Sequence, residues 1–395
     1  MEREWENWSG SIKFIPEKIE KPTSEAEVRD LVLKAKDELK DVKIVGAGHS
    51  SVPLVKTDKI LFSLENFKGL VDYNSEKKQV KLKPGTNIEE AGKILMHLRM
   101  CMHNTGDVDF QQLGGAFGTG THGSGKYLQN LSGMMIGCRL VDGMGKIREF
   151  NHESHPEMLK ALRVGLGSLG IFTELTIQAE PAEQMSRMEF CTHIETCLEH
   201  LDELSEQNRM FDFYWHPRND EAQIRICNPV GEGTKEMSFA KKLKEKEGWM
   251  YEILPNKRMI KYEEMEYAIP AEAGPECFRE VRKRVKERHR HYVGWRVLYR
   301  TIAADDAYLS PFYNQESVTI ALLQNNELEY KKYFDDMEPI FRDYGGRPHW
   351  GKKHNLKAHD LKTLYPEWDK FLDAKKLLDP DGIFLNDYLK EIFGI

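Results

Sequence analysis

The stretch Val45-Gly46-Ala47-Gly48-His49-Ser50-Ser51 decides how the rest of the chain is interpreted. It follows a short apolar run, residues 42–45, that predicts a strand, and it combines the small residues of a tight turn with one histidine. Glycines let a backbone approach a pyrophosphate closely, and the N–H groups of such a turn form a concavity that binds anions. The stretch therefore predicts a nucleotide cofactor that the histidine touches or to which it is bonded.

The same stretch does not match the dinucleotide-binding fingerprint of nicotinamide enzymes. Ser51 stands where the third glycine is needed, and Pro53 follows at once, so no helix opens after the turn. Residues 165–170 have the Gly-x-Gly-x-x-Gly spacing, but a helix is predicted before them and a strand after them. The fingerprint requires a strand first and a helix second. We therefore expect no nicotinamide binding at either place.

A second glycine-rich segment, residues 106–125, supports a bound cofactor. Most of its glycines lie from Gly114 onward, interleaved with threonine and serine hydroxyls, and we expect no stable helix or well-packed strand there. Its N–H groups and hydroxyls suit a pyrophosphate and the polar edge of a flavin. A flexible linker is the alternative. The segment, however, lies between two periodic stretches, residues 88–98 and 134–141, and is less polar than a linker.

Taken together, these motifs resemble the aldonolactone and alditol oxidases, which belong to the flavoprotein superfamily named for vanillyl-alcohol oxidase. Further matches follow in order at residues 303–306 (Ala-Ala-Asp-Asp), 347–352 (Arg-Pro-His-Trp-Gly-Lys) and 384–386 (Phe-Leu-Asn). The resemblance spans nearly the whole chain. It implies an α+β fold with an FAD-binding domain of the PCMH type and a mixed α/β cap domain that carries substrate-binding residues.

The domain boundaries expected from this resemblance follow changes in the sequence pattern. We expect an FAD-binding domain at residues 1–180, a substrate or cap domain at 181–345, and a C-terminal segment, 346–395, that returns to the first domain. Ser24 and Glu27 predict a capped helix start in the first domain. In the cap domain we expect an antiparallel sheet with helices on one side. Its predicted strands are 185–191, 210–215, 262–268 and 295–301, its helices 194–204 and 275–289, and its charged loop 232–246.

The resemblance also implies which residues hold the cofactor. His49 matches the position that bears FAD covalently, through an imidazole nitrogen bonded to the 8α carbon of the flavin; a noncovalent neighbour is the alternative. The segment at residues 165–170 is expected to lie against the flavin. The predicted cofactor-binding residues are Gly46, Ala47, Gly48, His49, Ser50, Asp107, Gln112, Gly115, Thr119, Gly120, Thr121, His122, Gly123, Ile171 and His349.

Arg300 and Lys352 are the predicted catalytic residues. Hydride transfer to a flavin leaves negative charge on the ring, and fixed cations stabilise developing charge and polarise substrate oxygens. One residue departs from the family pattern: Leu298 stands where the family commonly has the glutamate of Glu-x-Arg. Leucine cannot contact substrate hydroxyls. The acids that could face the substrate instead of this glutamate are Glu264, Glu266 and Asp107.

Composition describes an ordinary globular protein. The 395 residues leave room for two domains, with 40% hydrophobic and 31% charged residues. The net charge of −7, without a long basic block, argues against nucleic acid or an anionic membrane as the main partner. The most basic run, residues 279–290, is broken by two acids and predicts a solvated helix face.

Six scattered cysteines, with no Cys-x-x-Cys pair, predict neither a disulfide framework nor a metal centre. The N-terminal residues are acidic and lack the apolar core of a secretory signal. No apolar stretch approaches the roughly 18 residues that span a membrane. We therefore expect a cytoplasmic protein.

The leading interpretation is an FAD-dependent oxidoreductase that oxidises a CH–OH group of a sugar-derived lactone or polyol. Oxygen or another electron acceptor would reoxidise the flavin. Two alternatives remain open at this point: a dehydrogenase of a less hydroxylated alcohol, and a flavin-binding protein with altered or lost catalysis. Leu298 is the feature that keeps both open.

Overall fold

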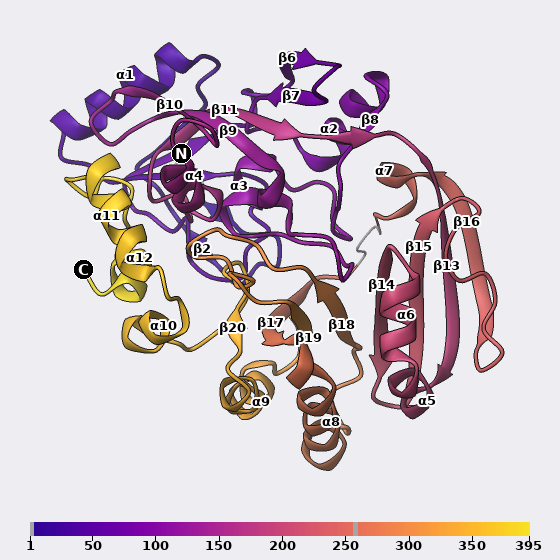
Figure 1. Ribbon diagram of the computed structural model, residues 1–395. Coiled ribbons are helices and arrows are strands. Elements are labelled where there is room, and N and C mark those ends of the chain that lie inside the picture. Colours follow the sequence, from indigo (N-terminus) through magenta and orange to yellow (C-terminus); the bar gives the residue numbers. More distant parts are fainter. Residues whose placement is uncertain (1–3, 256–259) are drawn as a thin grey trace.

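The computed structural model describes residues 4–255 and 260–395 (Figure 1). Residues up to about 180 form a three-stranded sheet, a five-stranded sheet, two short two-stranded sheets and their helices, and the following residues form one large sheet that helices cover. This is a mixed α/β architecture, as expected from the sequence. No helix in the described ranges is long and apolar enough to cross a membrane. All six cysteines are free thiols.

A small parallel sheet carries the turn at residues 46–50. Its strand order is β3-β5-β4, and all four residues of the central β5 are buried. Helix α1 crosses between β3 and β4, and packs against β9 of the neighbouring sheet. The turn therefore begins where a buried parallel strand ends. The elements are β3 (Lys18–Glu20), α1 (Glu25–Asp37), β4 (Val42–Val45) and β5 (Ile60–Ser63).

The predicted helix start at Ser24 is present, although its capping box differs in detail. The hydroxyl of Ser24 accepts the backbone N–H of Glu27 at 3.2 Å. The carboxylate of Glu27 reaches back to the N–H of Thr23 at 2.7 Å rather than to that of Ser24. Both side chains thus satisfy N–H groups at this end of the helix.

An antiparallel sheet with the order β10-β9-β11-β7-β6 completes this part of the chain. Strand β11 alternates strictly between buried and half-buried residues, the pattern of a sheet with one covered face. The predicted order around residues 165–170, helix and then strand, is confirmed by α4 and β11. The elements are β6 (Leu70–Asn74), β7 (Gln79–Leu82), α2 (Ile88–His97), β9 (Met135–Val141), β10 (Ile147–Asn151), α4 (Pro156–Arg163) and β11 (Ile171–Gln178).

The glycine-rich segment contains a short helix that the sequence argument excluded. Helix α3 (Leu113–Gly118) includes three glycines, so the expectation of no helix there is wrong. Its first amides donate to carbonyls outside the helix, from Leu113 to Thr86 and from Gly114 to Pro84, at 2.9 Å each. Its apolar side chains, Ala116 and Phe117, are buried. Tertiary contacts therefore hold a helix that glycine alone would not favour.

An eight-stranded antiparallel sheet dominates the second part of the chain. Its order is β16-β13-β15-β14-β18-β19-β17-β20. Helices α5, α6, α8 and α9 contact its strands and lie along its outer side (Figure 1). The strands are β13 (Gln184–His193), β14 (Met210–His216), β15 (Glu221–Pro229), β16 (Lys241–Trp249), β17 (Tyr262–Pro270), β18 (Val297–Ile302), β19 (Ser317–Asn325) and β20 (Arg347–Pro348).

The two faces of this sheet differ in chemistry because side chains alternate along each strand. On the helix side, Phe213 stacks on Tyr299 at a centroid distance of 4.9 Å, and Phe278 of α8 packs against both. The opposite face carries polar and charged side chains, among them Arg300 and Glu266. The helices are α5 (Ile194–Glu199), α6 (Leu201–Gln207), α8 (Gly274–Arg284) and α9 (Lys331–Asp343).

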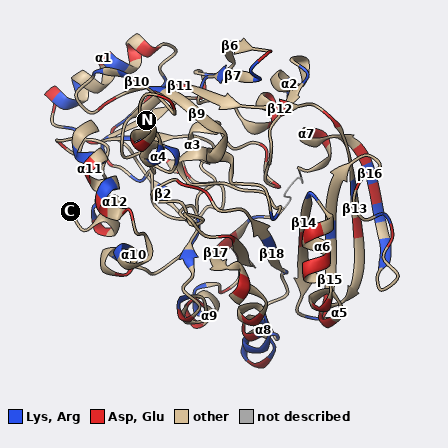
Figure 2. Ribbon diagram, viewed as in Figure 1, with Lys and Arg blue, Asp and Glu red and all other residues tan. Residues whose placement is uncertain are grey.

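The charged loop predicted at residues 232–246 is wrong in its second half. Strand β16 begins at Lys241 and pairs with β13. It is an edge strand, and seven of its nine residues are exposed. Lysines and glutamates suit such an edge because charge discourages pairing with another chain. Figure 2 shows that β16 carries both positively and negatively charged residues.

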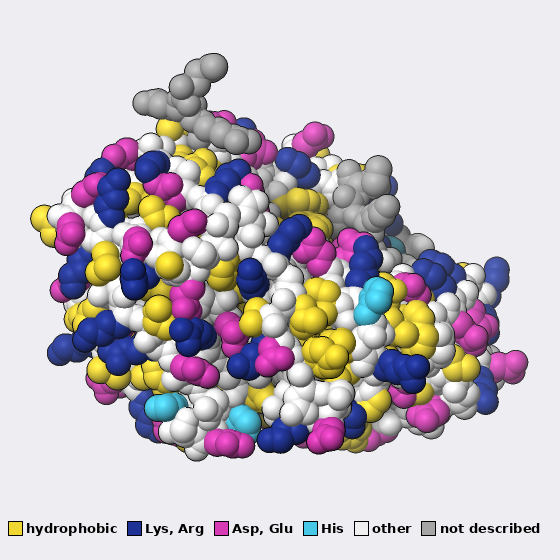
Figure 3. Space-filling model, turned by 90° about the horizontal axis from the view of Figure 1, so that it is seen from above, with side chains coloured by type: hydrophobic (Ala, Val, Ile, Leu, Met, Phe, Trp, Pro, Cys, Tyr) yellow, Lys and Arg dark blue, Asp and Glu magenta, His cyan; other side chains and the backbone are white. Residues whose placement is uncertain are grey.

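The basic run at residues 279–290 is only partly a solvated face. It spans the end of α8 and one π-helical turn, Val285–His289. Arg282 bonds to Asp220 and Glu195, and His289 is buried against Asp336 at 2.8 Å. The face of the molecule in Figure 3 likewise mixes positive and negative side chains with apolar ones.

The C-terminal segment runs back to the first sheets. Helix α11 contacts α4, and the Asn386 amide donates to the carbonyls of Pro53 and Lys56 at 2.8 and 2.9 Å. These bonds join residues more than 300 positions apart. The remaining elements are β1 (Trp5–Glu6), β2 (Lys13–Phe14), β8 (Met100–Cys101), β12 (Glu180–Pro181), α7 (Met250–Ile253), α10 (Ala358–Leu364), α11 (Trp368–Leu378) and α12 (Asp387–Phe393).

Candidate active site

A cavity of about 1160 Å³ lies where the 46–50 turn, α3 and the segment before β11 meet. The two glycine-rich segments and the Gly165–Gly170 segment, far apart in sequence, all contribute to its wall. The predicted cofactor residues that line it are Gly46, Ala47, Gly48, His49, Ser50, Gln112, Gly115, Thr119 and Ile171.

Glycines at this wall leave room for a ligand to approach the backbone. A Cβ atom at Gly115 or Gly167 would meet no atom of the described residues within 4 Å, so both positions open onto free space. Gly48 has a φ of +67°, and a Cβ there would lie 2.9 Å from the Trp5 ring. Within residues 4–255 and 260–395, the amides of Ala47 and Ser50 donate no backbone hydrogen bond. Open glycine positions and available amides fit the pyrophosphate and ring of a flavin dinucleotide.

A second cavity of about 530 Å³ adjoins the first and lies against the polar face of the eight-stranded sheet. His49 lines both cavities. Its ring packs edge-on against Trp8 at 4.8 Å and Phe110 at 5.0 Å. The predicted residues that line this second cavity are Asp107, Thr121, His122, His349, Arg300 and Lys352.

Two of the predicted cofactor residues line neither of these cavities. Gly123 borders a smaller pocket beside Arg300 and Asp107. Gly120, with a φ of +70°, packs near Pro311, Val164 and Asn130. Within the described residues, Gly120 therefore shapes the loop that carries Thr121 and His122.

The two predicted cations enter the second cavity from different segments. Arg300, near the end of β18, donates from Nη1 to the carbonyl of His122 at 3.3 Å. Lys352 forms an ion pair with Glu264 of β17. Burial would lower the pKa of Lys352, but the charge of Glu264 raises that pKa above its usual range. Likewise, burial opposes the charge of Arg300, yet the carboxylates of Glu266 and Asp107 raise its pKa. Both side chains are therefore cationic at neutral pH.

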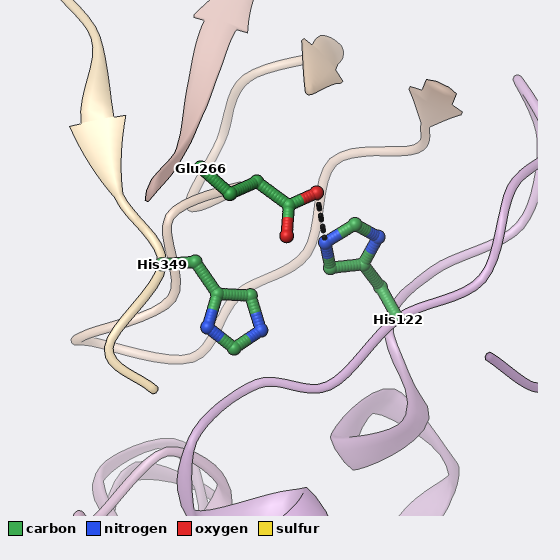
Figure 4. A group of neighbouring side chains, drawn as sticks. All are labelled: His122, Glu266 and His349. Carbon is green, nitrogen blue, oxygen red and sulfur yellow. Dashed lines mark ion pairs between the residues drawn. The ribbon is translucent and has the colours of Figure 1, made fainter. Parts of the chain in front are cut away.

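His122, Glu266 and His349, which all line the second cavity, lie close together (Figure 4). His122 Nε2 lies 3.3 Å from Glu266 Oε1. His122 Nδ1 lies 2.9 Å from the carbonyl of Gly123 and donates to it, because a carbonyl can only accept. Glu266 therefore faces the other ring nitrogen of His122, Nε2. When Nε2 also carries a proton, the ring is positively charged and attracts the carboxylate.

The same three residues have the composition of a metal site, with ligand atoms within 4.8 Å of one another. A metal ligand needs a free lone pair. His349 Nδ1 accepts the backbone N–H of Gly351 at 3.0 Å, so its lone pair is used and the other nitrogen carries the proton. This tautomer leaves at most two ligands from the trio. The arrangement is that of a hydrogen-bonding cluster.

The pKa shifts in this cluster keep Glu266 negatively charged and His349 neutral. Burial would raise the pKa of Glu266, but the neighbouring charges of His122 and Arg300 hold that pKa well below its ordinary value. Burial lowers the pKa of His349 to about 3, so its imidazole is neutral at physiological pH. The cluster thus combines an ionised carboxylate with a neutral N–H donor.

Asp107 belongs to a buried network at the side of the second cavity. Its Oδ1 lies 3.0 Å from Nη1 of Arg225, and its Oδ2 accepts the hydroxyl of Tyr214 at 2.8 Å. Arg225 also pairs with Asp212. Asp107 therefore connects the glycine-rich segment to the sheet.

Tyr214 and Tyr262 also line the second cavity, although neither is among the residues predicted from the sequence. A signal for Tyr214 was present, because β14 alternates Asp212, Tyr214 and His216 with large apolar residues. Such alternation marks one polar face of a strand. A weaker signal exists for Tyr262, which stands two and four residues before Glu264 and Glu266 and therefore lies on the same face of β17.

Leu298 lines the second cavity as part of an apolar wall. It is 2% exposed and packs with Tyr214, Tyr262, Ala321 and Leu323. The position at which a family glutamate was expected to meet substrate is therefore apolar in its contacts as well as in its identity.

Comparisons with known proteins agree with this geometry. A family model described as D-arabinono-1,4-lactone oxidase matches residues 225–392, and one described as an FAD-binding domain matches residues 16–151. The chain is 32% identical to an L-gulono-1,4-lactone dehydrogenase of Mycobacterium tuberculosis, over 99% of both chains. It is 26% identical to an L-gulonolactone oxidase of Mus musculus, over 99% of this chain and 98% of that one.

The fold is also found among solved structures. A cholesterol oxidase from Brevibacterium sterolicum superposes with a TM-score of 0.87 over 100% of this chain and 97% of that one. The sequence identity is 14%, so the likeness concerns the fold alone.

Proposed function

Because this chain belongs to the aldonolactone oxidase family of the vanillyl-alcohol oxidase flavoproteins, we propose that it is an FAD-dependent oxidoreductase that oxidises a CH–OH group of a sugar-derived lactone. One observation carries the proposal. His49 lines a large glycine-walled cavity and, on its other side, a smaller cavity that holds two cations. Residues of the first cavity would hold the flavin, and residues of the second would bind the substrate beside it.

Residues of the 46–50 turn, α3 and the segment before β11 would hold the FAD. The open Cβ positions of Gly115 and Gly167 support close approach of the cofactor. When bound, FAD supplies the acceptor for a hydride from the substrate carbon. We also propose that His49 bonds covalently to the flavin, since it lies within the complete family motif and faces both cavities.

Arg300 and Lys352 would act on the substrate side. Both reach the second cavity, and both are cations in a largely buried setting. Fixed cations there would bind substrate oxygens and stabilise the negative charge that the hydride carries to the flavin ring. His349, neutral and protonated on one nitrogen, would donate a hydrogen bond in the same region.

The test of cofactor and covalency is one absorption experiment. The purified protein should show a flavin spectrum, and the colour should remain with the pellet after acid precipitation. His49→Ala should release the flavin to the supernatant, while His97→Ala, on an exposed helix position, should not. A white pellet from the unaltered protein would rule out the covalent bond.

The test of the reaction is anaerobic reduction of the bound flavin. Aldonolactones should bleach the flavin absorbance, and oxygen or an added electron acceptor should restore it. Comparing oxygen with an artificial acceptor would distinguish an oxidase from a dehydrogenase. If no lactone or other alcohol reduced a flavin that dithionite reduces, the protein would be a flavin-binding protein without this activity.

A further inference from the structure

The carboxylate that Leu298 cannot provide is present in the same row of the sheet, two strands away. Leu298 of β18 pairs with Ala321 of β19, and Ala321 pairs with Glu266 of β17. Directly opposed residues in antiparallel strands point to the same face. Glu266 and Leu298 therefore rise from one face of the sheet with only the methyl group of Ala321 between them.

This separation is within reach of a glutamate side chain. Neighbouring strands lie about 4.8 Å apart, so the two backbones are roughly 10 Å apart, and a glutamate extended over an alanine covers much of that distance. Glu266 and Leu298 both line the second cavity. The charge of Glu266 acts on Arg300, two residues beyond Leu298 on β18. The carboxylate therefore serves the space that a glutamate at residue 298 would occupy.

Three carboxylates line the second cavity within the described ranges, and they are not equally engaged. Glu264 is paired with Lys352. Asp107 is held by Arg225 and Tyr214. Glu266 is 2% exposed, and its Oε1 makes no hydrogen bond of normal geometry with any residue that the structure describes, although His122 lies 3.3 Å away.

A buried carboxylate oxygen without a hydrogen bond is costly unless a ligand completes it. On the same face of the sheet, the Nε of Arg300 is also buried without a hydrogen-bond partner in the described chain. An oxygen acceptor and a nitrogen donor left open on one cavity wall match a substrate hydroxyl, which donates one hydrogen bond and accepts others.

Building on the proposed function, we propose that Glu266 binds the substrate by accepting a hydrogen bond from one of its hydroxyl groups, in place of a glutamate at position 298. The ligand is a hydroxylated lactone, and Glu266 determines which hydroxyl pattern it must have. His122 and Arg300 keep the carboxylate ionised, so Glu266 acts as a hydrogen-bond acceptor and not as the proton acceptor of the reaction.

The competing role for Glu266 is structural, as a counter-ion for His122 alone. The two roles differ in how they depend on the substrate. A counter-ion would affect every substrate alike, whereas a hydroxyl-binding residue matters only when the matching hydroxyl is present. Loss of a hydrogen bond to a charged group typically costs about 10- to 100-fold in binding.

The experiment measures anaerobic flavin reduction in the holoenzyme with an aldonolactone and with analogues that each lack one hydroxyl away from the reacting carbon. In the unaltered protein, one analogue should be about 10- to 100-fold poorer in kcat/KM. Glu266→Gln should lower kcat/KM for the full lactone by a similar factor and leave that analogue nearly unchanged. Glu263→Gln is the matched control, because Glu263 is a buried glutamate of the same strand that pairs with Lys353.

A second variant moves the carboxylate within the row. Glu266→Leu combined with Leu298→Glu should recover at least about tenfold of the kcat/KM that Glu266→Leu loses. If Glu266→Gln is not obtained folded, Glu266→Asp, which shortens the side chain, takes its place in the same comparison. Equal losses with the lactone and every analogue, or no loss at all, would overturn the proposal. Failure of every lactone to reduce the unaltered protein would instead overturn the proposed function.

Discussion

At the scale of single residues, the two cations of the site are in different electrostatic situations. Lys352 has a carboxylate of its own, Glu264. Arg300 has no carboxylate in direct contact among the described residues; it bonds to a carbonyl, and its charge is balanced at a distance by Glu266 and Asp107. In the proposed function, Arg300 would therefore offer a less neutralised positive charge to a substrate oxygen, and Lys352 would offer a fixed ammonium position. Each contribution can be removed separately.

We predict that Arg300→Ala and Lys352→Ala each slow flavin reduction by about 100-fold or more, because one preorganised electrostatic group of this kind is lost. Stopped-flow absorbance under anaerobic conditions measures the rate, and circular dichroism checks the fold. Lys353→Ala is the control, since that lysine is adjacent in sequence but pairs with Glu263. Wild-type reduction rates in both variants would mean that the substrate site lies elsewhere.

The apolar wall around Leu298 gives a prediction about substrate class. An alditol carries a hydroxyl on every carbon, and a hydroxyl beyond the one that Glu266 accepts would meet the side chains of Leu298 and Leu323, which offer no hydrogen bond. Such an unpaired hydroxyl costs about 1–3 kcal/mol. A lactone has fewer hydroxyls and can turn an apolar edge to this wall.

We therefore expect aldonolactones to reduce the flavin at least about tenfold more efficiently than xylitol or sorbitol. Leu298→Glu should narrow or reverse that preference, and Leu323→Ile, a volume-conserving change in the same wall, should leave it unchanged. The preference is measured as the ratio of kcat/KM values from anaerobic reduction. Alditols as clearly superior substrates of the unaltered protein would contradict the expectation.

At the scale of elements, local sequence signals predicted some structures and hid others. The helix at 25–37 and the strand after residue 170 follow from capping residues and periodicity, and both are present. Strand β16 and helix α3 were missed, because an exposed edge strand has the composition of a loop and α3 depends on hydrogen bonds to Thr86 and Pro84. The pairing of β17 and β18 with β19 could not be predicted either, because no local sequence signal places Glu266 near Leu298.

Substitutions at Gly115 of helix α3 can distinguish the effect of glycine on helix stability from its effect on cofactor binding. Gly115 lies within the helix and opens onto the large cavity, with no atom within 4 Å of a Cβ at that place. Gly115→Ala should leave thermal stability unchanged or slightly raised, since alanine favours a helix by about 1 kcal/mol over glycine. Gly115→Leu should fill the cavity and lower the flavin-to-protein absorbance ratio severalfold. Full flavin content in Gly115→Leu would show that the cofactor does not pass this position.

At the scale of the whole molecule, a buried lysine links the N-terminal part of the chain to the C-terminal segment. Lys43 of β4 is 1% exposed, and its Nζ donates to the carbonyl of Phe384 at 2.7 Å. Together with the hydrogen bonds of Asn386, this bond holds the C-terminal segment close to β4, the strand that leads into the 46–50 turn. Burial lowers the pKa of Lys43 to about 7, because the interior solvates its charge less well than water does.

This lysine should make stability depend on pH in a definite direction. Between the folded pKa of about 7 and the unfolded value of 10.5, the unfolded chain binds the proton more readily than the folded one. The free energy of unfolding therefore gains a contribution that is present above pH 10.5 and is lost as the pH falls to 7. Other groups titrate in this range, so the difference between the unaltered protein and Lys43→Met isolates the effect.

We predict that the unaltered protein gains stability relative to Lys43→Met as the pH rises from 7 to 10, by up to about 1.4 kcal/mol per pH unit. Below pH 7 the difference should be constant, since both folded and unfolded lysines are then charged. Urea unfolding at each pH measures it, and Lys34→Met, on the exposed side of α1, should give a flat difference. A flat or falling difference for Lys43→Met would show that Lys43 keeps its charge in the folded protein at little cost, and that the bond to Phe384 compensates for its burial.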